Sequence, residues 1–167
     1  MIIKGKVWKF GDNINTDLIL PTQAVAMSPK ERAQYVFSAN RPGWAQQVSS
    51  GDIVIAGTNF GTGSSRPAAL TMKDLGLGCL LAENINGLFF RSCVNESFPA
   101  LEVKGVCNCF EEGDIAEVDF TSGKIVNMRT SQEIQGDAWP DQLLAIYNAG
   151  GIIPLLKSQD LLEEQSC

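Results

Sequence analysis

The residues best suited to chemistry lie in one short loop that follows an apolar run. The run covers residues 53–56 (Ile-Val-Ile-Ala), and the loop reads Gly57-Thr58-Asn59-Phe60-Gly61-Thr62-Gly63-Ser64-Ser65-Arg66. A strand that leads through such a loop into a helix presents free backbone N–H groups and the positive end of the helix dipole. The two hydroxyls and the guanidinium at the end of the loop could therefore bind an anion or hold an oxygen that carries negative charge.

Composition places the chain among globular proteins and removes several classes of function. Its 167 residues suit a single domain, 1–167, and 44% of them are hydrophobic against 19% charged. The net charge of −6 argues against nucleic-acid binding, and no apolar run approaches the about 20 residues that a membrane span needs. The N-terminus lacks a signal-peptide pattern, so we expect a cytoplasmic protein.

Histidine is absent, which excludes Ser-His-Asp and Cys-His catalysis and His-ligated metal sites within this chain. The cysteines, Cys79, Cys93, Cys107, Cys109 and Cys167, show no spacing typical of a disulfide framework or a metal site. We interpret them as ordinary thiols. A chain without a metal cluster of its own can still lie beside a cluster that a partner holds.

Short apolar runs predict an α/β core that is followed by a β hairpin. The expected strands cover residues 3–10, 53–56, 79–82 and 99–103, and the hairpin joins 115–120 to 124–128. Helical segments between the last three of these strands imply right-handed parallel crossovers.

Capping residues indicate where the helices begin. Ser28, with Pro29 and Glu31 after it, forms a capping box for a helix that should run to about residue 38. Ser64 or Ser65 should cap the next helix, and Asn84 a third that continues to about residue 95. Two further helical segments are expected, one after Trp139-Pro140-Asp141 and one over residues 152–164.

Several segments match a known family in the same order along the chain. They are Asp12-Asn13-Ile14-Asn15-Thr16-Asp17 with Pro21, Gly51-Asp52, residues 59–66 (Asn-Phe-Gly-Thr-Gly-Ser-Ser-Arg), and Phe89-Phe90-Arg91 with Asn95 and Pro99. Together they resemble the small subunit of isopropylmalate isomerase and its homoaconitase relatives, which are separate-chain versions of the swivelling domain of aconitase. The resemblance runs over about residues 4–103.

The resemblance implies a fold, a partner and a reaction. The fold is a three-layer β/β/α swivelling domain of the aconitase C-terminal type, and the partner is a large subunit that holds a [4Fe–4S] cluster. The reaction is the reversible dehydration of a 2-hydroxy-dicarboxylate such as 3-isopropylmalate or a methylated malate.

The same resemblance assigns roles to individual residues. By matching position, Ser64 becomes the base that takes the proton from carbon, and Ser65 and Arg66 hold a substrate carboxylate. Thr22, Gln23 and Thr62 are expected to be further substrate contacts. Glycine at 61 and 63 would permit a positive φ and close approach of the backbone.

The chain departs from the family at positions that bear on the substrate. Pro67-Ala68 replaces the usual Glu-His, and Gln23 stands where an arginine is common. A neutral amide can form a hydrogen bond with a substrate but does not neutralise a carboxylate. The substrate could therefore be smaller or less charged than the family's usual one, although Ala24, Val25 and Ala26 would suit the apolar group of isopropylmalate.

Other interpretations stay open at this stage. The chain could be a non-catalytic module, derived from the same family, that binds a small anion or regulates. The loop serines could act only as helix caps, Arg91 could form only a surface contact, and Asn13 and Asp17 are expected to form turns rather than to bind ligands.

Overall fold

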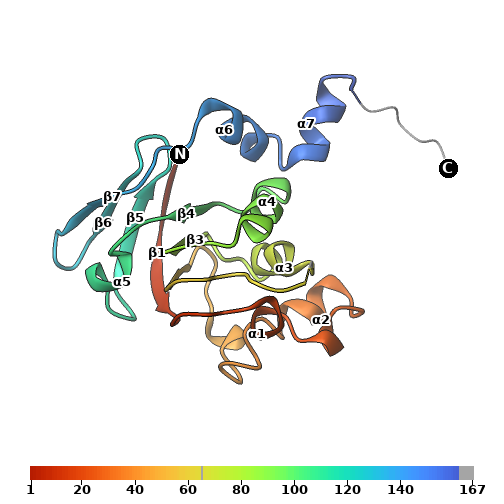
Figure 1. The fold of residues 1–167 in the computed structure, drawn as a ribbon, viewed down its shortest axis with the longest axis horizontal. Helices are drawn as coiled ribbons and strands as arrows, with labels where there is room; N and C mark the ends of the chain where they lie inside the picture. The colour runs from red at the N-terminus through yellow and green to blue at the C-terminus, as the bar shows by residue number, and fades with distance from the viewer. Residues whose placement is uncertain (65, 162–167) are drawn as a thin grey trace.

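The computed structural model describes residues 1–64 and 66–161, and its centre is one mixed sheet. The strand order is β4-β3-β2-β1-β5-β6-β7 (Figure 1). The strands are β1 (Ile2–Lys9), β2 (Ile53–Ala56), β3 (Cys79–Ala82), β4 (Ala100–Glu102), β5 (Ile115–Asp119), β6 (Lys124–Asn127) and β7 (Glu133–Gln135). The α-helices are α1 (Thr16–Ile19), α2 (Pro29–Ala33), α3 (Ala68–Asp74), α4 (Gly87–Asn95), α5 (Val106–Cys109), α6 (Asp141–Asn148) and α7 (Ile152–Ser158), and the 3-10 helices are η1 (Thr22–Ala24) and η2 (Ala45–Gln47).

Strand β1 belongs to two halves of the sheet. Its first part, Ile2 to Lys6, pairs with β5 in antiparallel fashion, and its last part, Val7 to Lys9, pairs with β2 in parallel fashion. Gly5 lies two residues before the first residue that pairs with β2, and a Cβ atom there would come within 2.0 Å of the Gly51 carbonyl oxygen. The parallel half continues through β3 and β4, and the antiparallel half through β6 and β7.

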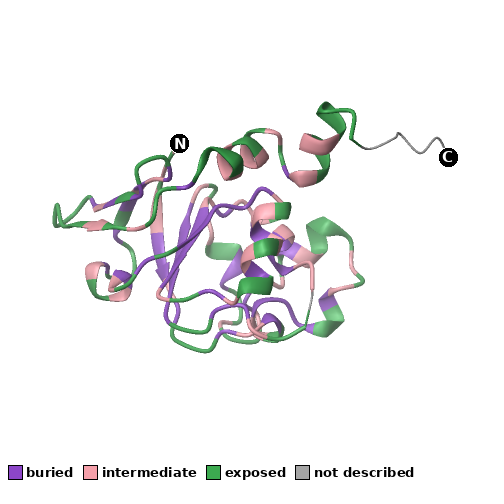
Figure 2. Cartoon of the chain, turned by 45° about the horizontal axis from the view of Figure 1, so that its top comes forward, coloured by how far each residue is buried: buried purple, intermediate pink, exposed green. Residues whose placement is uncertain are grey.

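Two hydrophobic cores lie on opposite faces of the parallel half. One core packs between the parallel strands and the helices, with Phe37, Trp44 and Phe60 at its centre. The other packs between the parallel strands and the antiparallel half, where Phe120 and Ile125 are fully buried (Figure 2). Helices, parallel strands and antiparallel strands therefore form three layers, which confirms the predicted β/β/α architecture.

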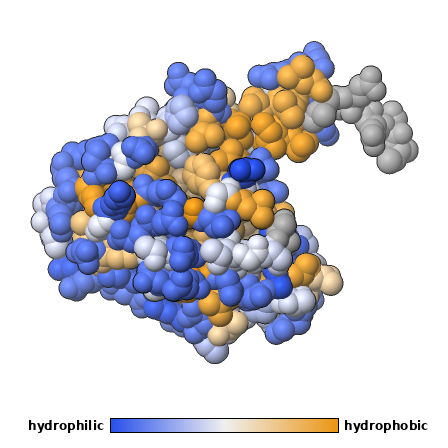
Figure 3. Space-filling model, viewed as in Figure 1, coloured by the Kyte–Doolittle hydropathy of each residue, from blue (hydrophilic) through white to orange (hydrophobic). Residues whose placement is uncertain are grey.

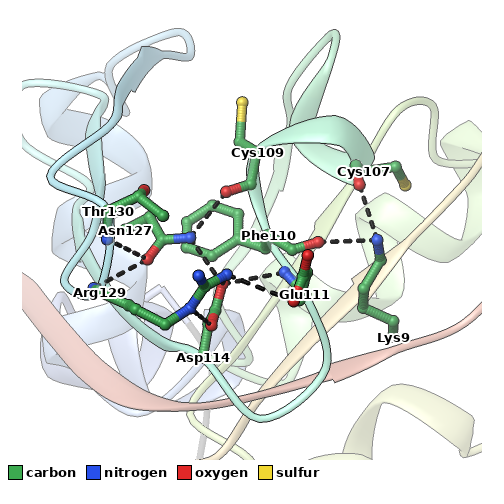
Figure 4. A network of polar contacts seen from close by, with 9 residues as sticks. All are labelled: Lys9, Cys107, Cys109, Phe110, Glu111, Asp114, Asn127, Arg129 and Thr130. Atoms are coloured by element: carbon green, nitrogen blue, oxygen red, sulfur yellow. Dashed lines mark hydrogen bonds and ion pairs between the residues drawn. The ribbon is translucent and has the colours of Figure 1, made fainter.

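A polar network holds the antiparallel half in place (Figure 4). The Asp114 carboxylate accepts hydrogen bonds from Arg129 Nε at 2.5 Å, Asn127 Nδ2 at 2.7 Å and the Glu111 amide at 2.9 Å. The hydrogen bond from Arg129 holds the pKa of Asp114 well below its ordinary value, although burial opposes this shift. Lys9 Nζ donates to the carbonyls of Cys107 in α5 and of Phe110 just after it, so this network also fixes β1.

The predicted strands and the hairpin are confirmed, but the starts or ends of four helices were wrong. Helix α2 ends at Ala33 rather than near residue 38, because Val36 and Phe37 are fully buried and Phe37, at φ +55°, donates its amide to Ile19. Helix α4 has Asn86 as its N-cap rather than Asn84, whose side chain donates to Glu102 instead.

The third correction concerns the loop that carries Ser64. Helix α3 begins at Ala68 with Pro67 at its N-cap position and no side-chain cap, so Ser64 is not the N-cap. Ser65 lies outside the described residues. Because α3 starts after Arg66, the loop runs on past the point where the sequence predicted a helix.

The last two helices pack less tightly than the rest. Helix α6 follows Trp139-Pro140 and α7 follows Gly150-Gly151, as the sequence indicates, and neither contains a buried residue. Helix α7 ends at Ser158, short of the predicted end at residue 164, and residues 162–164 lie outside the described residues. Within the described part of the chain, no helix is long and apolar enough to cross a lipid bilayer.

Candidate active site

The candidate site lies where β1 and β2 end side by side and lead into two loops. The backbones of these loops form hydrogen bonds with each other: Asn13 N to Thr58 O at 2.8 Å, and Gly61 N to Ile14 O at 2.7 Å. The carboxyl ends of parallel strands are where open α/β sheets place their binding sites. The loop of Asn13 and the loop of Ser64 therefore form one unit, although about fifty residues separate them.

Two glycines set the path of the second loop. Gly61 has φ +79°, and a Cβ atom there would come within 2.3 Å of the Phe89 ring. Gly63 has φ +109°, and a Cβ atom there would lie 2.9 Å from Thr16 Oγ1. Both positions require a residue without a side chain, as the sequence predicted.

Ser64 is exposed, and its hydroxyl is held by Arg66. The Nε atom of Arg66 donates to Ser64 Oγ at 3.2 Å, and the Ser64 carbonyl accepts a hydrogen bond of 3.0 Å from Thr16 Oγ1. A positive group next to a hydroxyl oxygen favours its ionised form. The Ser64 hydroxyl thus faces solvent while a cation lies against it.

Arg66 is fixed by contacts to three segments. Besides Ser64, its Nη1 atom donates to the Leu20 carbonyl at 3.0 Å, and its Nη2 atom forms an ion pair with Asp17. The Arg66 side chain is 15% exposed, whereas that of Asp17 is 63% exposed. Contacts to described residues thereby use three of the five guanidinium donors, and no other described residue takes the remaining two.

The loop also offers backbone donors. The amides of Gly63 and Ser64 donate no hydrogen bond to other residues within 1–64 and 66–161. The amides of Phe60 and Gly61, by contrast, are used in contacts to Asn84 and Ile14. Within the described residues, the anion-binding potential of this loop therefore comes from Gly63, Ser64 and Arg66 rather than from a helix terminus.

The space around Ser64 is open rather than enclosed. A hollow of about 10 Å³ borders Ser64, Thr16 and Leu88, which is far too small to enclose a dicarboxylate. A polar hollow of about 350 Å³ lies next to it between α3 and α4, and Arg66 and Ser92 line both. The described residues thus form one wall of a site, and a second surface is needed to close it.

The other predicted substrate contacts do not line the hollow beside Ser64. Thr62 lies in the loop and is partly exposed. Thr22 and Gln23 lie exposed on η1, just after the Leu20 carbonyl that holds Arg66, but they do not border the hollow beside Ser64. Arg91 lies exposed on α4.

Sequence reasoning missed four residues around Ser64. Thr16 and Asp17 hold the backbone of Ser64 and the side chain of Arg66, and Leu88 and Ser92 line the hollow from α4. The Asn-Thr-Asp segment was a usable signal for the first two, but Asp17 was expected only to form a turn. The position of α4 beside the loop depends on packing and had no local signal.

The described cysteines do not gather into a metal site. Cys79 and Cys93 are buried, which raises the pKa of both thiols. Burial, and next the Glu83 carboxylate, raise the pKa of Cys107 to about 11. No group of three His, Cys, Asp or Glu residues that could hold a metal ion occurs in the described ranges, and these residues do not fit an iron–sulfur cluster.

Comparison with known proteins identifies the family. The Aconitase C-terminal domain model matches residues 10–104. An isopropylmalate/citramalate isomerase small subunit from Methanocaldococcus jannaschii is 41% identical over 160 residues, with 95% of each chain covered. A 3-isopropylmalate dehydratase small subunit from Halothermothrix orenii is 40% identical, with 94% of this chain and 96% of the relative covered.

A solved structure agrees with these matches. The crystal structure of a 3-isopropylmalate dehydratase from Methanocaldococcus jannaschii superposes with a TM-score of 0.90 and 31% identity, covering 96% of both chains. Sequence and fold agree over nearly the whole length of the chain. The chain therefore belongs to the aconitase C-terminal domain family, among the small subunits of isopropylmalate dehydratases.

Proposed function

We propose that this chain is the small subunit of a hydro-lyase of the 3-isopropylmalate dehydratase type, active together with a large subunit. The observation that carries the proposal is the exposed Ser64 hydroxyl with the Arg66 guanidinium against it. The names of the relatives support the reaction class and imply a large partner. The cytoplasmic location expected from the sequence stays a prediction.

The substrate class is a 2-hydroxy-dicarboxylate. One relative is named for both isopropylmalate and citramalate, and citramalate is a methylated malate of the kind the sequence suggested. Ser65, Arg66 and Thr62 would contact the substrate from the loop, and Thr22 and Gln23 from η1. The two remaining donors of Arg66 suit one carboxylate oxygen each.

This chain supplies the base that removes the proton from carbon. Dehydration requires a base close to the carbon beside a carboxylate, and Ser64 is the exposed hydroxyl at the end of the loop. Arg66 Nε, and the amides of Gly63 and Ser64, which donate to no other described residue, would stabilise a negative oxygen there. Departure of the hydroxyl group requires a Lewis acid, which we assign to a [4Fe–4S] cluster of the large subunit.

The test replaces Ser64 by alanine in the reconstituted complex. With 3-isopropylmalate and citramalate as substrates, S64A should lower kcat by about a thousandfold, because a positioned base contributes roughly 10²–10⁴. Binding of the large subunit should be unchanged. Ser50→Ala is the matched control, since Ser50 is an exposed serine that precedes β2, whereas the site follows it.

The alternative, a non-catalytic anion-binding module, predicts a different result. Turnover by the complex would then be unaffected by S64A. That outcome would contradict the role of Ser64 as base, whereas a loss of turnover with an intact complex supports it.

A further inference from the structure

Helix α7 presents apolar side chains that the described part of the chain covers only in part. Four of its seven residues are Ile or Leu, and none of these belongs to either core or packs against one. Ile153 is 53% exposed, and Leu161, just after the helix, is 65% exposed. Figure 3 shows the apolar surface that α6 and α7 present. Exposed apolar side chains grouped in this way are typical of a protein interaction site.

Helix α7 is attached to the far end of α4. Gly151, which precedes α7, has φ +133°, and a Cβ atom there would lie 2.6 Å from the Asn95 carbonyl oxygen. The Gly151 amide also donates to Ile146 O, so the turn between α6 and α7 is fixed. The start of α7 is therefore held close to the last residue of α4.

The exposed face of α4 joins α7 to the candidate site. Leu88, Arg91 and Asn95 are exposed and recur at the i, i+3 and i+7 spacing of one helix face. Leu88, at the start of the helix, is 51% exposed and borders the same hollow as Ser64. Arg91 makes no side-chain hydrogen bond or ion pair within the described part of the chain. Ser64, the α4 face and α7 thus follow one another on the surface.

We propose that Leu88, Arg91 and Asn95 of α4, together with Ile153 of α7, form the docking face for the large subunit. This inference rests on the proposed function, in which Ser64 acts on a substrate held by that subunit. A stable interface covers about 800 Å² of each partner, a disc of roughly 16 Å radius. The nine residues of α4 span only about 13 Å, so a partner centred near Ser64 also reaches α7.

The same geometry favours the large subunit over a second copy of this chain. The hollow that Ser64 borders is too small to hold a substrate, and the larger hollow next to it does not border Ser64, so we infer that another protein surface completes the site. A second copy seated on the docking face would occupy the area next to Ser64 that this surface needs.

The experiment measures the Kd between this chain and its own large subunit, by titration calorimetry, and then kcat at a saturating concentration of this chain. Ile153→Lys should raise Kd by about tenfold or more, because it places a charge in the apolar part of the interface. It should leave kcat at saturation unchanged, since Ile153 does not border the site. Met128→Lys is the matched control: Met128 is 44% exposed, lies after β6, and should leave Kd and kcat unchanged.

The outcomes separate this inference from the proposed function. If the wild-type complex turns over substrate but Ile153→Lys binds as tightly as wild type, the docking face is wrong and the proposed function stands. If the wild-type chain neither binds the large subunit nor supports turnover, the proposed function fails first. Ile153→Lys could instead dissociate a homodimer of this chain and leave the Kd for the large subunit unchanged. In that case α7 is a self-association surface, and the inference is overturned.

Discussion

Replacement of Arg66 by lysine tests the assignment of a proton-transfer role to the loop. Arginine reaches Ser64 Oγ, the Leu20 carbonyl and Asp17 with three different nitrogen atoms. Lysine keeps the positive charge but carries it on one nitrogen at the end of a flexible chain. In R66K the ammonium group should remain with Asp17 or Leu20 and leave the Ser64 hydroxyl without its cationic partner.

The size of the effect follows from the bond that is lost. A hydrogen bond between a charged and a neutral group contributes about 1.5–3 kcal/mol. Since about 1.4 kcal/mol corresponds to a factor of ten, R66K should lower kcat by roughly 10- to 100-fold. The companion variant Asp17→Asn should lower kcat by no more than about fivefold, because Asp17 is 63% exposed and exposed ion pairs contribute about 0.2–1 kcal/mol.

The assay is steady-state kinetics of the reconstituted complex with 3-isopropylmalate. A role at Ser64 predicts a fall in kcat, whereas a role only in carboxylate binding predicts a rise in KM with kcat unchanged. Lys124→Arg is the control, because Lys124 is exposed on β6 and belongs neither to the loop nor to the proposed docking face. A pure KM effect, or wild-type kinetics in R66K, would refute the proposed activation of Ser64 by Arg66.

Two predictions concern stability. Because Arg129 holds the pKa of Asp114 below its unfolded value of 3.8, the Asp114 contribution to stability is complete above pH 4 and is lost as pH falls toward the folded pKa. Asp114→Asn should therefore lower the free energy of unfolding by about 2 kcal/mol at pH 7 and less below pH 3. Urea unfolding from pH 7 to pH 2.5 checks this, and parallel curves for variant and wild type would contradict it. Gly61→Ala places a methyl group against Phe89 at a positive φ and should cost about 2–4 kcal/mol; an unchanged thermal midpoint would show that the loop can take another path.

Local patterns in the sequence predict many of the strands and turns of this fold. The strands at residues 53–56 and 79–82 are short apolar runs that are buried on both faces, and the run itself identifies them. The hairpin at residues 121–123 and the capping box at Ser28 are equally local, and both are present. The sequence predicted the ends of the helices less accurately. Val36 and Phe37 lie in the core, outside the helix that was predicted to contain them. Their burial depends on residues that are distant along the chain, so no local pattern predicts it.

The candidate site shows the same division between sequence and tertiary structure. The order of residue types in the loop was enough to single out Ser64, Ser65 and Arg66, because their spacing along the chain is itself the signal. The sequence could not show that Arg66 turns back to Leu20 and Asp17, nor that Leu88 borders Ser64. Those contacts join segments that are distant along the chain, and they exist only because parallel pairing of β1 with β2 brings the two loops to the same edge and packing sets α4 beside them.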